Sequence, residues 1–106
     1  MKKPYYAVIF TSVRNTTDNG YSEMAIKMEE LAKTQPGYLG IESAREEIGI
    51  TVSYWENLEA IANWKQNADH LAAQIKGAKD WYTKYYVRIC LVEREYAFNK
   101  EPIPNK

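Results

Sequence analysis

The chain has 106 residues, the size of one small domain that can bury a core without disulfides or structural metals. Its fourteen basic and fourteen acidic residues cancel, so no net charge favours nucleic acid or an anionic membrane as partner. One cysteine and one histidine exclude an internal disulfide and a Cys/His metal centre. The short, aromatic N-terminal run lacks the apolar region of a signal peptide, so a soluble, cytoplasmic protein is expected.

The first part of the chain predicts a strand followed by a helix. Residues 5–13 are rich in β-forming side chains and lead into a turn-forming run. From Tyr21 the apolar residues recur at helical spacing, which predicts an amphipathic helix with one packed face. Gln35-Pro36-Gly37 ends this helix, because proline removes a backbone donor and glycine accepts a left-handed conformation.

A hairpin follows the first helix. Residues 38–45 and 48–55 are two short β-rich runs on either side of a turn. Gly49 is expected to adopt a positive φ in that turn. The short spacing makes the two strands antiparallel neighbours.

The second half of the chain predicts a helix, a strand and a tail. Asn57 is expected to cap a helix over residues 58–78. Its apolar positions form one narrow stripe that should face the sheet, namely Ile61, Trp64, Ala68, Leu71, Ile75 and Ala78. Residues 85–96 form a last strand whose centre is apolar on both sides, which implies burial or cover by a dimer partner. Residues 99–106 contain two prolines and predict an extended tail after a domain of residues 1–98.

The order of elements is β-α-β-β-α-β, which indicates an α+β protein of the ferredoxin-like type. In this arrangement four strands form an antiparallel sheet, and both helices lie on one face. The other face is then bare, and large apolar patches seldom stay exposed on monomers. A homodimer that pairs the bare faces is the simplest cover.

The three tryptophans can fill the core or line a pocket for a flat, apolar ligand. Trp55 ends a strand and Trp81 precedes one, so both are expected to serve the scaffold. Trp64 lies on the apolar stripe of the second helix, where it is either core or a pocket wall.

An uncharged polar stripe runs beside Trp64 on the same helix. It consists of Asn63, Asn67, His70 and Gln74. Such groups beside aromatic rings can bind and orient a polar aromatic substrate, with His70 as general base because its ordinary pKa lies near neutrality. The alternative is a solvated helix flank that carries a lone histidine.

Arg88 lies among apolar residues of the last strand, where an unpaired buried charge would be costly. It therefore needs a carboxylate or an anionic ligand. The structural alternative is an ion pair with Glu42 or Glu56 on a neighbouring strand, and the catalytic alternative is stabilisation of a developing oxyanion or enolate. Cys90 is expected to be a small buried hydrophobe.

Four segments, taken in their order and spacing, carry a resemblance to a known family. They are the run from Gln35 to Ser43, the corner Ser53-Tyr54-Trp55-Glu56-Asn57, the pair Asn63-Trp64 followed by His70, and the closing Tyr86-Val87-Arg88. Over nearly the whole chain they resemble the antibiotic biosynthesis monooxygenase (ABM) family. The resemblance implies a dimeric α/β barrel in which two sheets pack face to face, in agreement with the bare face.

Two kinds of activity are implied by this resemblance. The first is cofactor-independent oxygenation of a small aromatic or polyketide-like substrate, with His70 as base, Trp64 as pocket wall and Arg88 stabilising negative charge. The second is haem binding or degradation, with His70 as axial ligand. A third reading is a non-catalytic dimeric module that binds a small molecule, and the sequence leaves all three open.

The haem-degrading branch differs from this chain at two points. That branch uses an asparagine on the first strand, where this sequence has Ile9, Phe10 and Thr11, and an axial histidine ten residues beyond the tryptophan, where this sequence has Gln74. His70 and Trp64 lie about 120° apart on a continuous helix, so only a break near residues 67–69 would bring both into one pocket.

Overall fold

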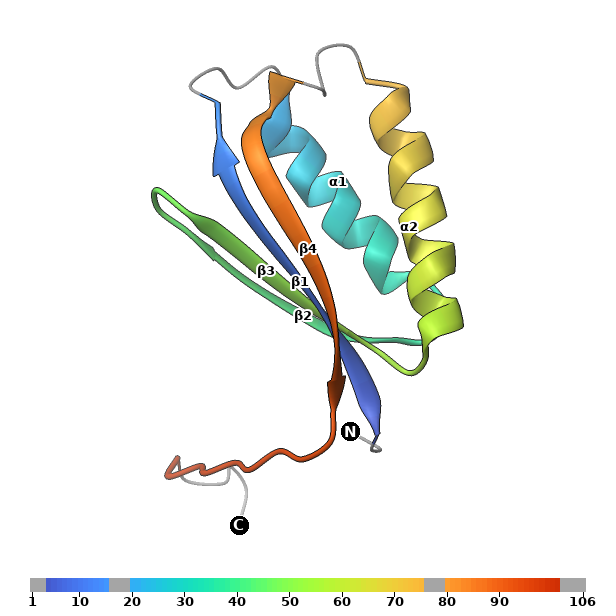
Figure 1. The fold of residues 1–106 in the computed structure, drawn as a ribbon, viewed down its shortest axis with the longest axis vertical. Helices are drawn as coiled ribbons and strands as arrows, with labels where there is room; N and C mark the ends of the chain where they lie inside the picture. The colour runs from blue at the N-terminus through green and yellow to red at the C-terminus, as the bar shows by residue number, and fades with distance from the viewer. Residues whose placement is uncertain (1–3, 16–19, 76–79, 102–106) are drawn as a thin grey trace.

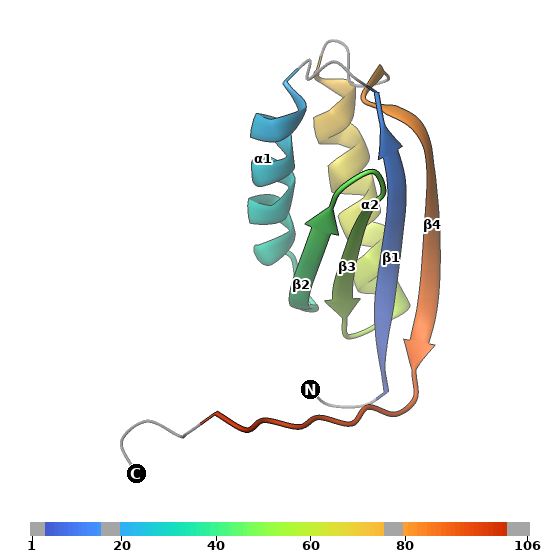
Figure 2. The ribbon, with the colours of Figure 1, turned by 90° about the vertical axis from the view of Figure 1, so that its left-hand side faces the viewer.

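The computed structural model describes residues 4–15, 20–75 and 80–101. Its elements in chain order are β1 (Tyr5–Arg14), α1 (Tyr21–Lys33), β2 (Tyr38–Arg45), β3 (Gly49–Trp55), α2 (Leu58–Ala73) and β4 (Tyr82–Val92). The strands form an antiparallel sheet in the order β2-β3-β1-β4, and both helices lie on one face of it (Figures 1 and 2). The predicted ferredoxin-like α+β fold is confirmed. Among the described residues, no helix combines the length and the apolar character that a membrane crossing requires.

Local signals place the start of α2 and the turn after α1 where the sequence predicts them. Asn57 has an extended backbone, and its Oδ1 accepts a hydrogen bond from the Ala60 N–H at 2.8 Å, which caps α2. Gly37 has a φ of 84°, and a Cβ at this position would lie 2.6 Å from the Ala60 Cβ. Glycine therefore lets the loop after α1 pack against the first turn of α2. The predicted end of α2 at residue 78 lies outside the described residues, and the helix ends at Ala73.

The prediction of a positive φ for Gly49 is wrong. Gly49 begins β3, and the glycines with positive φ in the described part of the chain are Gly20 and Gly37. Glycine has a different effect here, because it leaves open the space in which the Arg45 guanidinium lies and which a Cβ would fill. The register pairs Gly49 with Arg45 of β2 on one side and with Ser12 of β1 on the other. The Arg45 side chain crosses Gly49, and its Nη2 donates to the Ser12 Oγ.

The core lies between the sheet and α2. Its buried cluster consists of Ala32, Trp55, Ala60 and Ile61. Trp55 is fully buried, and its ring stacks on Trp64 with 5.9 Å between the ring centroids. Trp81 is also buried, so the positions of Trp55 and Trp81 agree with the scaffold role that the sequence predicts.

β4 begins and ends earlier than predicted, and it is exposed. It is an edge strand, and Tyr85, Tyr86 and Ile89 keep more than half of their side-chain surface exposed, at 57%, 57% and 53%. The predicted burial of this strand is wrong for a single chain, because no further strand or helix of the described chain covers it. Its cover by a second copy stays a prediction. From residue 93 to residue 101, the last described residue, the chain has no helix or strand and runs away from the body, so the extended segment begins before residue 99 (Figure 1).

Candidate functional site

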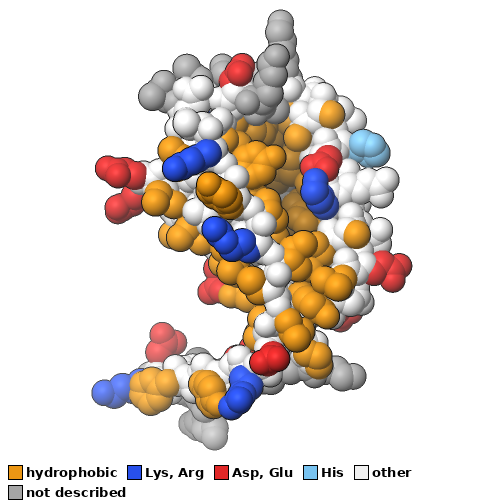
Figure 3. All heavy atoms as spheres, in the orientation of Figure 1, with side chains coloured by type: hydrophobic (Ala, Val, Ile, Leu, Met, Phe, Trp, Pro, Cys, Tyr) orange, Lys and Arg blue, Asp and Glu red, His pale blue; other side chains and the backbone are white. Residues whose placement is uncertain are grey.

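A cavity of about 950 Å³ lies between the sheet and the helices. Figure 3 shows apolar side chains lining a hollow between β4 and α2. The volume lies within the range of roughly 300–1,000 Å³ that is usual for small-molecule sites. Residues from all four strands and both helices line this cavity, so the fold itself positions its walls.

The middle of the cavity is apolar. Its walls include Val8, Ile41, Ile61, Trp64, Ala68, Ala72, Val87 and Ile89. Trp64 is half-buried, because one face of its ring packs on Trp55 while the side chain also lines the cavity. Ala68 and Ala72 are four residues apart on α2, so they leave a strip of the helix without bulky side chains. This strip provides room for a flat ligand beside Trp64.

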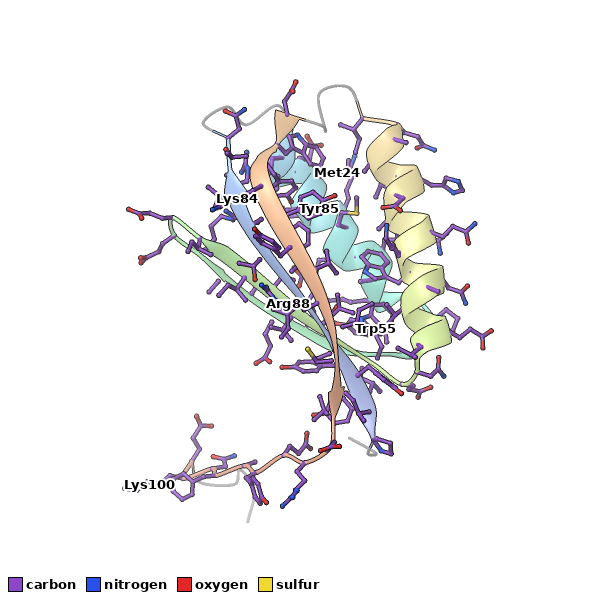
Figure 4. The ribbon with its side chains drawn as sticks, viewed as in Figure 1. Met24, Trp55, Lys84, Tyr85, Arg88 and Lys100 are labelled. Carbon is purple, nitrogen blue, oxygen red and sulfur yellow. The ribbon has the colours of Figure 1, made fainter. Side chains whose placement is uncertain are left out.

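One end of the cavity carries polar groups, and we name it the arginine–tyrosine end: Tyr21, Arg45, Tyr82 and Tyr85. Cross-strand pairs place Arg45, Gly49, Ser12 and Tyr85 in one row across the sheet, on the face that the helices cover. Ser12 is almost fully buried, and its hydroxyl accepts the hydrogen bond from Arg45. Figure 4 shows Trp55 toward one end of the space beside β4 and Tyr85 toward the other.

Aromatic packing fixes the tyrosines at this end. The Tyr21 ring meets the Tyr82 ring edge-on, with 5.7 Å between centroids, and Tyr82 meets Tyr85 at 5.8 Å. The Arg14 guanidinium carbon lies 3.5 Å from the Tyr21 ring centroid, a cation–π contact, and that of Arg45 lies 5.9 Å from it. Two cationic groups therefore flank one phenol ring.

Tyr82 is a neutral hydrogen-bond donor at physiological pH. Burial and a hydrogen bond with the Tyr21 side chain raise the pKa of Tyr82, and the positive charges of Arg45 and Arg14 oppose this rise. Because burial is the larger effect, Tyr82 keeps its proton in the range where enzymes usually work.

Of the predicted catalytic residues, Trp64 lines the cavity and His70 does not. α2 is continuous through residues 67–69, so the break that would bring His70 beside Trp64 is not present. His70 is exposed. The structure therefore does not bring these two side chains together, and a catalytic role for His70 stays a prediction.

The predicted substrate-binding residues Asn63, Asn67 and Gln74 are exposed and do not line the cavity either. Asn67 makes a structural hydrogen bond, in which its Nδ2 donates to the Gln35 Oε1 at 2.8 Å. This hydrogen bond joins α2 to the segment after α1. Binding roles for the three residues stay predictions.

Arg88 lies on the open face of the sheet, opposite the helices, because side chains alternate along β4. The prediction that Arg88 is buried is wrong for a single chain: the side chain is exposed, with its guanidinium carbon 5.2 Å from the Tyr86 ring centroid (Figure 4). The prediction that Glu42 or Glu56 lies on a neighbouring strand is also wrong, because the strand beside β4 is β1. Glu42 instead accepts a hydrogen bond from the Tyr54 hydroxyl at 2.7 Å.

The arginine–tyrosine end was not predicted from the sequence. Arg45 and Gly49 lie on either side of the hairpin turn, and their pairing is the signal that could have found it. An arginine that is paired with a glycine can extend its side chain over the glycine toward the next strand, because no side chain is in the way. Tyr21 and Tyr82 belong to elements far apart in the sequence, and only the tertiary fold brings them together.

Sequence and structure comparisons give a consistent family. The sequence model of the family "antibiotic biosynthesis monooxygenase" matches residues 4–76. The uncharacterized protein YqjZ of Bacillus subtilis (strain 168) is 50% identical over 99 residues, which cover 92% of this chain and 87% of that protein.

Solved structures share the fold. A putative antibiotic biosynthesis monooxygenase from Nitrosomonas europaea superposes with a TM-score of 0.71 at 15% identity, covering 87% of this chain and 93% of that chain. A mutant of SnoaB from Streptomyces nogalater, described as a cofactor-independent oxygenase, gives 0.64 at 10% identity, covering 95% and 98%. A mutant of MhuD with two manganese protoporphyrin IX molecules per active site gives 0.66 at 20% identity, covering 88% and 99%.

Proposed function

The chain belongs to the antibiotic biosynthesis monooxygenase family, and we propose that it is a monooxygenase that binds a flat aromatic substrate between the sheet and α2. The observation that supports this proposal is the cavity of about 950 Å³, with Trp64 in its wall and small residues along α2. SnoaB, which shares the fold, is a cofactor-independent oxygenase, so this fold accommodates such chemistry without a metal or flavin.

The reaction is the oxidation of an activated CH₂ group to a ketone. A base removes a proton from the substrate, and the resulting carbanion transfers electrons to dioxygen. One oxygen atom becomes the new carbonyl and the other leaves as water, while the four electrons come from the two C–H bonds of the substrate. The cavity contributes by holding the rings in one orientation and by excluding water from the carbanion.

Haem is the other ligand that the family suggests. The cavity does not fit haem, because the predicted axial ligand His70 does not line it. Among the described residues that line the cavity there is no histidine, and His70 lies outside it. We derive no haem chemistry from this arrangement. We expect haemin to bind at most weakly, because the sequence also lacks the asparagine on the first strand that the haem-degrading branch uses.

Turnover of an anthrone tests the proposal. The wild-type chain should accelerate oxygen uptake by 1,8-dihydroxyanthrone above the rate in buffer. Ala68→Phe places a ring in the cavity and should abolish the acceleration, whereas Ala62→Phe, on an exposed position of the same helix, should leave it intact. Equal turnover in the two variants would place the reaction outside the cavity, and an inactive wild-type chain would contradict the proposed substrate class.

The proposal includes a homodimer formed through the open faces of two sheets. One cross-strand row on that face runs from Arg88 on β4 through Ile9 and Val52 to Glu42 on β2. The row is apolar at its centre and carries opposite charges at its two ends. A twofold axis parallel to the strands would set Arg88 over the partner's Glu42, and this self-complementarity supports the dimer.

Sedimentation equilibrium tests the dimer. The wild-type chain should sediment at twice 12.3 kDa at micromolar concentration. Arg88→Glu should weaken the dimer, and the double variant Arg88→Glu with Glu42→Arg should restore it. Lys27→Glu, an equal charge change on the exposed surface of α1, is the control. A wild-type monomer, or a double variant no better than the single one, would refute this interface.

A further inference from the structure

Within the part of the chain that the structure describes, Arg45 has no carboxylate partner at the arginine–tyrosine end. Arg45 is still accessible to solvent, and the partner found for its guanidinium is the neutral hydroxyl of Ser12. Among the described residues, no carboxylate lies within salt-bridge distance of Arg45. A guanidinium has five N–H donors, so most of them remain for a ligand.

The acidic residues in the cavity wall pair with lysines and not with Arg45. They are Glu29 and Asp69. Glu29 Oε1 lies 3.5 Å from the Lys33 Nζ, and Asp69 Oδ2 lies 2.7 Å from the Lys65 Nζ. Arg45 is therefore a cation of the cavity wall that has no carboxylate of its own among the described residues.

Tyrosine hydroxyl groups and the open space beside Gly49 complete the arginine–tyrosine end. The Tyr82 hydroxyl experiences the charges of both Arg45 and Arg14, which shows that the positive potential extends to the phenol. Tyr21 packs edge-on against Tyr82, so the two hydroxyl-bearing rings are held in place. Gly49 provides the space in which the Arg45 guanidinium lies. Apolar walls continue from here toward Trp64.

Building on the proposed function, we propose that Arg45 and Tyr82 bind the carboxylate of an aromatic acid whose rings occupy the apolar middle of the cavity. The planar guanidinium matches a carboxylate with two parallel hydrogen bonds. Tyr21 and Tyr82 hydrogen-bond to each other, and because this bond uses only one of their two hydroxyl protons, the pair supplies a third donor. The substrate class is therefore an anionic aromatic molecule with its acid group at one end.

A matched pair of fluorescent probes tests this assignment on the full chain. Anthracene-2-carboxylate and anthracene-2-carboxamide carry their polar group at one end of the ring system, have nearly the same shape and differ in charge. The wild-type chain should bind the acid about 10-fold more tightly than the amide, the discrimination expected of a charge-assisted hydrogen bond. Fluorescence titration at constant ionic strength measures both dissociation constants.

Two variants disturb the Arg45 guanidinium by different routes, one by deleting it and the other by displacing it. Arg45→Met deletes the guanidinium, and Gly49→Ala keeps it but fills the space in which it lies. Both should reduce the preference for the acid to about 1-fold and leave the affinity for the amide unchanged. Lys84→Met removes an exposed cation of β4 that does not line the cavity, and it should keep the wild-type preference. Arg45→Met leaves the buried Ser12 hydroxyl without its donor, so Gly49→Ala is the check if Arg45→Met unfolds.

The outcomes separate this inference from the proposed function. If both probes bind equally to the wild-type chain, or if the acid preference survives in Gly49→Ala and Arg45→Met, the anion site is refuted while the aromatic cavity stands. If neither probe binds, both proposals fail. If the acid preference disappears as expected but 1,8-dihydroxyanthrone is not oxidised, the anion site stands and the monooxygenase proposal fails.

Discussion

The two ends of the cavity use aromatic side chains for different purposes. At one end Trp55 is fully buried and stacks on Trp64, with an intramolecular hydrogen bond from the Trp55 Nε1 to the Ser53 Oγ at 2.9 Å. At the other end Tyr21 and Tyr82 carry hydroxyl groups and lie beside guanidinium groups. The first arrangement fills volume, whereas the second leaves donors facing a space that a ligand can enter.

The difference follows from what each end can bury. Apolar surface at the tryptophan end is removed from water on folding, which stabilises the chain. Burial does not stabilise the arginine–tyrosine end in the same way, because burying an arginine without a carboxylate partner is unfavourable. Its polar groups therefore remain partly solvated, and they are available for binding. Stability and recognition are placed at opposite ends of one cavity.

The largest expected effect is at the tryptophan end. Trp55→Ala should lower the free energy of unfolding by about 3–5 kcal/mol, because it leaves a void in the core. Trp64→Phe keeps an aromatic ring at a half-buried position and should cost less than about 1.5 kcal/mol. Urea denaturation followed by circular dichroism measures both values. A larger loss in the free energy of unfolding for Trp64→Phe than for Trp55→Ala would contradict this comparison of the two ends.

A second prediction concerns the general base. A base must lie within hydrogen-bond distance of the proton it removes, and Asp69 lines the cavity whereas His70 does not. We therefore expect Asp69→Asn to lower anthrone turnover by roughly 10²-fold and His70→Ala to leave it unchanged. Lys65→Met breaks the same Lys65–Asp69 salt bridge without removing the carboxylate, so it controls for the lost pair. A large loss in His70→Ala would restore the role that the sequence predicts for histidine.

The sequence predicted the fold well because the fold depends on local patterns. Helical spacing, the Asn57 cap and the β-rich runs each act over a few residues, and they identified every helix and strand in the right order. Trp55 and Trp81 were predicted as scaffold from their places at strand ends, and they are buried. The predicted burial of β4 is wrong for a single chain, because β4 is an edge strand and hydrophobic side chains along it are exposed.

The site was harder to predict because it depends on tertiary register. A helical periodicity of four, three and four placed Asn63 and His70 on one stripe, but it did not show that this stripe faces away from the cavity. Arg45 became a candidate only when the register set it opposite Gly49 and beside Ser12. Polar residues that converge from different elements leave no periodic signal along the chain.

The smallest expected effect tests the donor role of Tyr82. Tyr82→Phe removes one hydroxyl from the arginine–tyrosine end, so it should weaken binding of anthracene-2-carboxylate by about 3- to 10-fold, as the loss of one hydrogen bond to an anion does. Binding of the amide should change less. The stability of the folded chain should stay close to wild type, because Tyr82 is only partly buried. An unchanged affinity for the acid would remove Tyr82 from the site and leave Arg45 as its donor.

The pH dependence of the same titration sharpens this test. The pKa of Tyr82 is raised, so below the ordinary tyrosine pKa of about 10 the phenol is protonated and can donate in both the free and the bound chain. The groups whose charge or hydrogen bond acts on this phenol are Tyr21 on α1, Arg14 on β1 and Arg45 on β2. The affinity for the acid should therefore be constant from about pH 6 to pH 9 and should fall only at higher pH, as Tyr82 ionises and repels the carboxylate. A midpoint of this fall near pH 7 would show that a group with a pKa near neutrality controls binding, which Tyr82 cannot explain.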